Sequence, residues 1–191
     1  PDVSDFYLER IRDGQVQLDG AWSPVQTRSE RIEVAGGDPV TITVRSTSHG
    51  PVLSDVLEPL AEAGRSAPVA GKGATDEDFA VSLAWTGLQP TTTADAILGL
   101  NLATNFSEFR AAAAKFAVPA QNLVYADTSG HIGYQAPGLL PVRVSAVSGA
   151  PAGYWPAPGW DSSYSWRGFV KPADLPWVLD PTDEMIVTAN Q

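Results

Sequence analysis

Two histidines and many scattered serines and carboxylates are the side chains here that could supply a base or a nucleophile. His49 and His131 both fall in strand-and-turn contexts. A Ser-His-Asp triad can be assembled on paper from almost any such set, so composition alone does not identify one. No Gly-x-Ser-x-Gly elbow and no phosphate-binding loop occur in the sequence. We therefore interpret both histidines as structural, with His49 holding a strand end by hydrogen bonding before Gly50.

Oxygen ligands for a hard cation gather near the start of the chain. Asp2, Asp5 and a carbonyl between them could offer three oxygens from one short turn, and calcium prefers such ligands. The acidic run 76–78 is interpreted as a solvated loop instead. The sequence has no cysteine and only two distant histidines, which disfavours zinc and excludes disulfides.

Two other classes of function stay open at this point. Trp155, Trp160 and Trp166 lie among prolines and glycines, where they could form a platform for a sugar ring or simply cover a proline-rich loop. A non-catalytic module that binds carbohydrate or another ligand is therefore the alternative to an enzyme. A self-contained serine hydrolase is a third hypothesis, and it predicts that a fluorophosphonate labels this chain.

Composition limits the partners and the compartment. The net charge of −10 repels phosphate backbones, which makes nucleic acid a poor candidate partner. No apolar stretch approaches the roughly 20 residues of a membrane span. The sequence opens at Pro1 with neither an initiator Met nor a signal peptide, so we expect it to begin within a longer protein.

The elements that must position these residues are predicted to be mainly strands. Short apolar runs alternate with 17 glycines and 16 prolines, a pattern typical of a β-rich chain with many turns. Asp13-Gly14 and Asp19-Gly20 predict tight turns between antiparallel strands. Further strands are expected over 31–34, 40–44, 79–85, 122–126, 131–134 and 185–188, and residues 58–78 are expected to form an irregular surface excursion.

Two helices are predicted between the strands at 79–85 and 122–126. Thr93 is placed to cap the first, with Ile97 and Leu98 facing inward. Asn105 with Glu108 three residues later resembles a capping box for the second, which phenylalanines at helical spacing place against the core. We find no repeat and no linker, so the sequence predicts an α+β fold with a single domain over 1–191.

A series of short segments, in order, resembles the β-subunit of penicillin acylases and the related cephalosporin, aculeacin and acyl-homoserine-lactone acylases. The segments are Asp5–Arg10, Ser48–Leu53, Leu83–Gly87, Pro119–Asp127, Gly130–Tyr134, Gly159–Asp161, Trp166–Phe169, Leu175–Pro176 and Ile186–Asn190. No single segment is decisive, but together they span essentially the whole chain. The resemblance implies an internal piece of the β-subunit and a partial N-terminal-nucleophile αββα sandwich, mainly antiparallel β with a two-helix insertion.

The resemblance also implies a reaction, the hydrolysis of an amide between an acyl group and an amine-bearing nucleus. In this family an N-terminal serine is the nucleophile and its own α-amino group is the base, a group whose pKa of roughly 7.7–8 suits that task. Pro1 has no nucleophilic side chain. We therefore expect this piece to lack the nucleophile and to be inactive alone.

Individual residues take roles from the same resemblance. Asn190 matches the family's oxyanion-hole asparagine, and Trp85 and Gln121 match positions that line the acyl pocket. Asp2, the Ser4 carbonyl and Asp5 match the ligands of a structural calcium ion, while no cofactor is expected for the chemistry. Gln121 is polar where the best-known members are apolar, which puts an aryl-acetyl preference in doubt.

The partners implied are the rest of the β-subunit, the α-subunit and a small-molecule acyl amide. A β-lactam side chain, a lipopeptide and an acyl-homoserine lactone all remain open as that substrate. Neither nucleic acid nor membrane is expected to bind. The isolated piece would expose sheet edges and apolar faces, so it is expected to be a homo-oligomer or an unstable monomer. The family's usual location implies a periplasmic or secreted protein.

Overall fold

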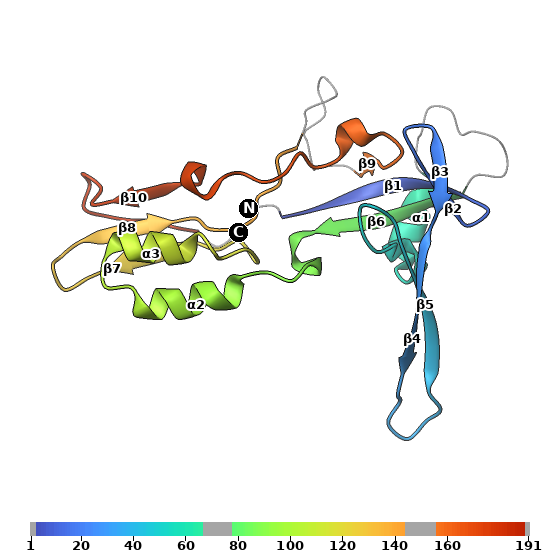
Figure 1. Ribbon diagram of the computed structural model, residues 1–191, viewed down its shortest axis with the longest axis horizontal. Coiled ribbons are helices and arrows are strands. Elements are labelled where there is room, and N and C mark those ends of the chain that lie inside the picture. The colour runs from blue at the N-terminus through green and yellow to red at the C-terminus, as the bar shows by residue number, and fades with distance from the viewer. Residues whose placement is uncertain (1–2, 67–77, 144–155, 190–191) are drawn as a thin grey trace. The chain divides into compact units, whose positions relative to one another are not determined.

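The computed structural model describes residues 3–66, 78–143 and 156–189, which fall into two compact units (Figure 1). Unit 1 comprises residues 1–3, 86–142 and 166–191, and unit 2 comprises residues 4–85 and 143–165. The prediction of a single domain over 1–191 stays a prediction, because two compact units can belong to one domain.

Unit 2 is built around a five-stranded sheet centred on β1 (Ser4–Arg12). β1 pairs antiparallel with β6 (Asp78–Trp85) along its length, and the register places Ser4 opposite Trp85. The other strands are β2 (Gln15–Leu18), β3 (Ala21–Pro24) and the short β9 (Ala157–Pro158), which runs parallel to β1. Its core contains Ile11, Val16, Val25, Val52 and Ala80.

The Asp-Gly pairs form the predicted turns of this sheet. Asp13 and Gly14 have φ of 49° and 71°, and Asp19 and Gly20 have φ of 48° and 81°. Left-handed backbone at both central positions matches the twist of antiparallel strands, which is why this dipeptide favours hairpins. These sequence predictions are confirmed.

A two-stranded hairpin follows, formed by β4 (Gln26–Ile32) and β5 (Val40–Ser46). The strand expected over 40–44 is confirmed, whereas the one expected over 31–34 is part of β4, which starts earlier and ends at Ile32. Its apolar side chains are exposed, with Val40 and Ile32 about half accessible. A hairpin with so little burial gains little stability from its own contacts.

The prediction of an irregular excursion over 58–78 is wrong for its first part. A 3-10 turn (Leu53–Asp55) leads into the helix α1 (Glu58–Ser66). Arg65 bonds both Glu58 and Glu62 along the helix surface. Gly64 is buried against the backbone of β6, where a β-carbon would lie 2.9 Å from the Phe79 carbonyl oxygen. The composition of this segment, rich in alanine, glycine and acidic residues, did not indicate a helix. The close packing of Gly64 on β6 stabilises it. Residues 67–77 lie outside the described part of the chain.

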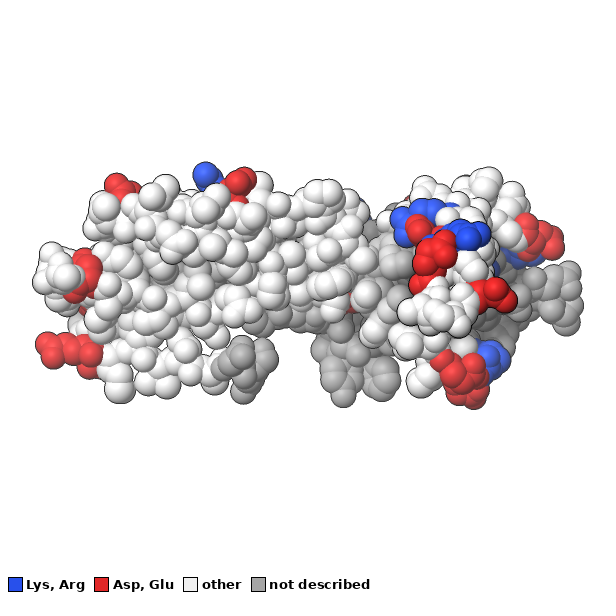
Figure 2. Space-filling model, turned by 90° about the horizontal axis from the view of Figure 1, so that it is seen from below, with Lys and Arg blue, Asp and Glu red and all other residues white. Residues whose placement is uncertain are grey.

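Unit 1 begins with a 3-10 turn (Thr86–Leu88) and the two predicted helices, α2 (Thr93–Leu102) and α3 (Phe106–Ala113). Asn105 caps α3 as predicted, because its Oδ1 accepts from the Glu108 backbone N–H at 3.0 Å. The expected orientation of α2 is wrong, since Ile97 and Leu98 are 51% and 64% exposed while Ala96 is buried. The face of unit 1 on the side of α2 carries few charged side chains (Figure 2).

A three-stranded sheet in the order β10-β8-β7 completes unit 1. β7 (Leu123–Ala126) and β8 (Ile132–Gln135) form the predicted hairpin around 127–130. β10 (Trp177–Leu179) pairs with β8 and was not expected. Residues 185–188 were expected as a strand, but no described strand pairs with them. Two further 3-10 turns occur, Ser162–Tyr164 in unit 2 and Pro172–Asp174 in unit 1.

Within the described ranges, none of the helices has the length and apolar character needed to cross a bilayer.

Candidate functional site

The residues predicted to form the acyl site are only partly described by the structure. Asn190 and Asp2 lie outside the described residues. Trp85 ends β6 in unit 2 with its side chain 41% exposed, and Gln121 is half-buried in unit 1, where its N–H donates to the Pro137 carbonyl. Trp85 and Gln121 thus belong to different units, and the surroundings of each are given for its own unit.

One end of the unit 2 sheet does bring predicted residues together. Ser4 is the register partner of Trp85, and Asp5 is the partner of Ala84. Two predicted calcium ligands and one predicted pocket residue thus share the same end of the β1–β6 pair. Ser4 and Trp85 are 81 residues apart in the sequence, and the antiparallel pairing of β1 with β6 places them opposite each other.

The described calcium ligands are engaged by a cation of the chain itself. Arg143 Nε donates to Asp5 Oδ2 at 2.7 Å, and Arg143 Nη2 lies 3.5 Å from the Ser4 carbonyl oxygen. The Asp5 carboxylate is buried, with 6% of its side chain exposed. A dication here would stand beside a guanidinium, so this pair of ligands does not fit calcium unless Arg143 moves. No described group of three or more histidine, aspartate or glutamate side chains is arranged to hold a metal.

A buried polar cluster that the sequence did not predict lies in the middle of unit 2. Its centre is Glu9 on β1, of which only 1% is exposed. Thr47 Oγ1 and Ser82 Oγ donate to Glu9 Oε1 at 2.7 and 2.6 Å, and His49 Nδ1 lies 3.0 Å from the same oxygen. A buried carboxylate is tolerated when hydrogen bonds replace its water, and three partners converge here.

The electrostatics of this cluster keep Glu9 ionised. Burial by itself raises the pKa of Glu9, but hydrogen bonds from His49, Ser82 and Thr47 and the attraction to His49 outweigh it and lower the pKa below its ordinary value. An ionised carboxylate only accepts hydrogen bonds, so His49 Nδ1 must carry the proton that it shares with Glu9. In the neutral form of the ring, Nε2 is then an acceptor.

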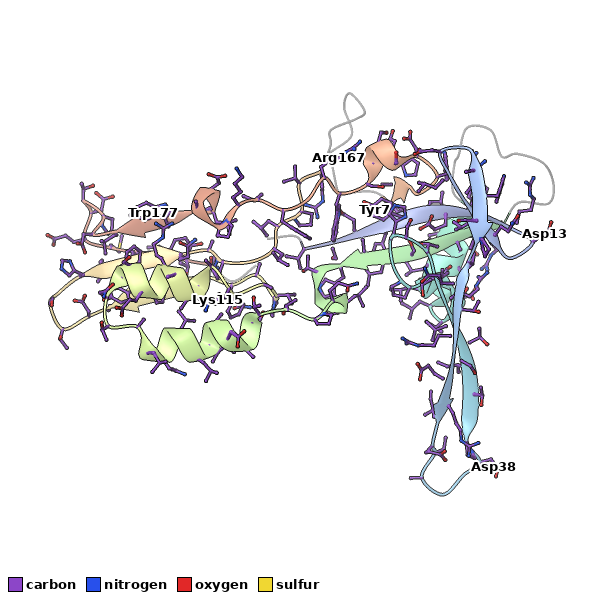
Figure 3. All side chains as sticks on the ribbon, in the orientation of Figure 1. Tyr7, Asp13, Asp38, Lys115, Arg167 and Trp177 are labelled. Carbon is purple, nitrogen blue, oxygen red and sulfur yellow. The ribbon has the colours of Figure 1, made fainter. Side chains whose placement is uncertain are left out.

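The imidazole of His49 is held by contacts to one face of its ring and to Nε2. Its ring stacks on Tyr7 with centroids 3.9 Å apart and planes 10° apart (Tyr7 is labelled in Figure 3). Its Nε2 lies 3.2 Å from Ser165 Oγ. The hydrogen bonds of His49 agree with the structural role predicted for it. They also place its ring between the Ser165 hydroxyl and the Glu9 carboxylate.

One sequence signal could have pointed to this cluster. Tyr7, Glu9 and Ile11 alternate on one face of β1, so a carboxylate sits between two apolar residues on the face that is buried. Its partners could not have been read from the sequence, because Thr47, Ser82 and Ser165 are 38, 73 and 156 residues away along the chain.

Unit 1 contains an apolar cavity of about 740 Å³ between α3 and the sheet. Gln121 is not among the described residues that line it. Arg110 and Lys115 are the cationic residues among its described lining. Arg110 Nε donates to Gln135 Oε1 at 2.9 Å, and its guanidinium lies 3.9 Å from the ring centre of Trp177, labelled in Figure 3. This cavity is therefore separate from the residues predicted to line an acyl pocket.

His131 is exposed in unit 1 and bonds Asp180, with 2.7 Å between Nδ1 and Oδ2. That hydrogen bond, the charge of Asp180 and the charge of Asp127 raise the pKa of His131 above its ordinary value. The Asp180 carboxylate also accepts from the Ile132 N–H, so the pair fastens the chain beyond β10 to the start of β8. These contacts agree with a structural role.

The tryptophans considered as a sugar platform are engaged in packing where they are described. The Arg10 guanidinium lies 4.2 Å from the ring centre of Trp160, and Phe79 meets the same ring edge-on. Trp166 packs edge-on against Phe169. Trp155 lies outside the described residues. Nothing in this geometry favours a carbohydrate site.

Comparisons with known proteins point in one direction. A family model described as penicillin amidase matches residues 1–191. The acyl-homoserine lactone acylase QuiP of Pseudomonas fluorescens Pf-5 is 34% identical over the whole chain, which spans 22% of that relative. The penicillin acylase 2 proenzyme of Pseudomonas sp. SE83 is 31% identical over 99% of the chain, again 22% of the relative.

A solved structure gives the same answer for the fold. A thermostable penicillin G acylase from Alcaligenes faecalis matches 100% of this chain with a TM-score of 0.77 and 28% identity, and the match covers 31% of that acylase chain. The α+β fold predicted from the sequence is confirmed by this similarity.

Proposed function

Because this chain belongs to the penicillin amidase family, we propose that it is a segment of an acylase that hydrolyses a linear acyl amide. The observation that carries the proposal is the family match over all 191 residues. The chain spans about a fifth of the length of the curated relatives that it matches, so the activity proposed is that of a larger protein. Alone, the segment is expected to be inactive.

The chemistry proposed for this segment is transition-state binding rather than nucleophilic attack. Asn190 is proposed to donate its side-chain amide to the oxyanion of the tetrahedral intermediate, and an amide suits this role because it holds no titrating proton. Trp85 and Gln121 are proposed to contact the acyl group. The exposed indole of Trp85 supports its part, since a side chain 41% accessible is available for contact.

The substrate, the compartment and the partners follow as further proposals. The relatives are named acyl-homoserine lactone acylase and penicillin acylase, and this chain is proposed to serve a substrate of that acyl-amide class. A periplasmic or secreted location is proposed. The segment is proposed to require the rest of the β-subunit and an α-subunit, and to self-associate when isolated. Exposed Leu102 and Leu98 on α2 support the last point.

A structural calcium ion at Asp2, the Ser4 carbonyl and Asp5 is a separate proposal. One buried carboxylate and one carbonyl at the start of β1 support it, since both are oxygen ligands of the kind calcium takes. Arg143 competes for both oxygens.

The experiment that tests the main proposal measures amide hydrolysis with chromogenic acyl-anilides and acyl-homoserine lactones. It compares this chain with a longer protein in which the chain is joined to the flanking polypeptide encoded beside it. Activity is expected only in the longer protein. Asn190→Ala there should lower kcat about 10²–10³-fold, the usual cost of removing one oxyanion donor. Asn101→Ala, on the exposed surface of α2, serves as the control and should leave kcat unchanged.

Amide turnover by this chain alone would place the nucleophile within residues 1–191 and overturn the proposal that the segment is inactive. No hydrolysis of any acyl amide by the longer protein would overturn the acylase assignment itself.

A further inference from the structure

We propose that Ser165 is a nucleophilic serine, activated by His49 and Glu9, and that it accepts an acyl or phosphonyl group from small electrophilic esters. The proposal does not depend on the amidase function above, because it concerns a site within unit 2 and chemistry of this chain alone. Two observations carry it, the separations between the three side chains and their order of burial, and the proton on His49 Nδ1 that Glu9 requires agrees with them.

The three side chains stand in the order that nucleophilic catalysis requires. Ser165 Oγ lies 3.2 Å from His49 Nε2, and His49 Nδ1 lies 3.0 Å from Glu9 Oε1. A serine, its base and the group that orients the base occur at such separations in hydrolases of unrelated folds. The residues come from three distant parts of the sequence, so no local turn forces them together.

The protons are placed for a base. Ionised Glu9 can only accept, so the proton that His49 shares with it lies on Nδ1, and in the neutral ring Nε2 then carries a lone pair. In that form of the ring the Ser165 hydroxyl can donate to Nε2, which is the direction its proton travels when the oxygen attacks. Tyr7, stacked on the imidazole at 3.9 Å, keeps the ring in this orientation.

The burial of the cluster changes in steps from the carboxylate to the serine. The Glu9 side chain is 1% exposed and the His49 side chain 8%, whereas Ser165 is half-buried. Ser165 is therefore the most exposed of the three residues. The segment is held in place, because the Ser165 N–H donates to the Ser162 carbonyl and the Tyr7 hydroxyl donates to the Tyr164 carbonyl, both at 3.1 Å.

The absence of a side chain at Gly159 leaves room for the Glu9 carboxylate. A β-carbon at Gly159 would collide with Glu9 Oε2, and Oε2 has no hydrogen-bond partner among the described residues. The half-satisfied carboxylate keeps its negative charge close to His49. That charge stabilises the imidazolium that forms when Ser165 gives up its proton.

The reaction is balanced without a cofactor. Ser165 Oγ attacks the phosphorus of a fluorophosphonate, the P–F bond breaks, fluoride leaves and the hydroxyl proton passes to His49 Nε2. With a p-nitrophenyl ester the acyl C–O bond breaks instead, nitrophenolate leaves and Ser165 becomes an ester. The phosphonylated serine is a stable adduct, so one phosphonylation per chain is expected.

The test treats the folded 191-residue chain with a tagged fluorophosphonate and locates the adduct by peptide mass spectrometry. One adduct per chain on Ser165 is expected, and it should disappear when the chain is unfolded in urea. Ser165→Ala should remove it. Ser163→Ala changes a nearby serine outside the cluster and should leave the labelling rate unchanged.

The role of the base is tested with His49→Gln and Glu9→Gln, each checked for a native near-ultraviolet circular dichroism spectrum. A drop of at least tenfold in the labelling rate is expected for a folded His49→Gln. If His49→Gln does not fold, the wild-type adduct position and the Ser163→Ala control still decide the question. No adduct on folded wild type, an adduct elsewhere, or an unchanged rate in a folded His49→Gln would each overturn the proposal.

Discussion

Arg143 forms a buried ion pair with Asp5, with Nε and Oδ2 2.7 Å apart and only 19% of the arginine side chain exposed. The same guanidinium reaches toward the Ser4 carbonyl oxygen. These oxygens are two of the three that the sequence assigned to calcium. The chain thus carries its own cation at the start of β1, and a calcium ion must compete with it.

Replacing Arg143 should therefore strengthen calcium binding if Asp2, Ser4 and Asp5 form a site. Arg143→Met removes the guanidinium and keeps an unbranched apolar stem, so affinity measured by isothermal titration should rise at least tenfold over wild type. Arg167→Met, an exposed arginine of unit 1, is the control and should change nothing. Equal affinity in Arg143→Met and wild type would show that Arg143 does not compete, and no heat in either would remove the calcium proposal.

Glu9→Gln should destabilise unit 2, because the amide cannot accept three hydrogen bonds on one oxygen as the carboxylate does. Bonds to a charged group contribute about 1.5–3 kcal/mol, so a loss on the order of 2 kcal/mol in the free energy of unfolding is expected. Urea unfolding followed by tryptophan fluorescence measures it. Glu62→Gln on the exposed surface of α1 should lose less than about 0.5 kcal/mol. An equal loss in both variants would contradict a special role for Glu9.

The same carboxylate predicts how stability depends on pH. Because folding lowers the pKa of Glu9 below 4.5, its contribution is present above that pH and is lost as the pH falls through the folded pKa. Wild type should therefore lose stability more steeply than Glu9→Gln as the pH falls below 4.5, because position 9 of the variant has no proton to take up. Parallel stability curves for the two proteins would contradict this.

The parts of the fold that the sequence predicted correctly depend on neighbours along the chain. Asp13-Gly14 and Asp19-Gly20 form turns because their backbone must adopt positive φ, which this dipeptide tolerates. Asn105 caps α3 because its side chain needs only an N–H three residues away. Such interactions close within one turn, so residue types alone determine them.

The parts that it missed depend on tertiary contacts. The residues of α2 are apolar nearly all round, so their pattern does not show which side is buried. The structure buries Ala96, and a β-carbon at Gly99 would lie 2.9 Å from the β-carbon of Ala112, so small residues bring α2 close to α3 and leave Leu98 outside. The cluster around Glu9 has the same origin, since its partners are joined only by folding.

His131 should titrate above its ordinary pKa while Asp180 is present. The hydrogen bond and charge of Asp180 favour the protonated ring, so this contribution to stability is complete below pH 6.5 and is lost as the pH rises through the folded pKa. In Asp180→Asn, nuclear magnetic resonance titration should show the His131 pKa shifted downward. Asp174→Asn, an exposed aspartate of unit 1, should leave it unchanged. An unaltered His131 pKa in Asp180→Asn would contradict the pairing.

Gly133→Ala should destabilise unit 1 because its β-carbon would collide with the ring of Phe106, which packs across β8 at that point. The ring cannot retreat easily, since Phe109 and Tyr125 lie 5.9 and 5.4 Å from it, centre to centre. Overpacking of this kind costs about 1–3 kcal/mol. Phe106→Leu removes atoms at the point of collision, so Gly133→Ala should cost less in that background.

A double-mutant cycle measured by urea unfolding gives the coupling between Gly133 and Phe106, expected to be at least about 0.5 kcal/mol for residues in contact. Val124→Ala, which changes an exposed side chain on the neighbouring strand β7, should show no coupling to Phe106→Leu. An equal loss in the free energy of unfolding from Gly133→Ala, with Phe106 or with Leu at position 106, would contradict the proposed collision. The close approach of α3 to β8 would then not explain the glycine in this strand.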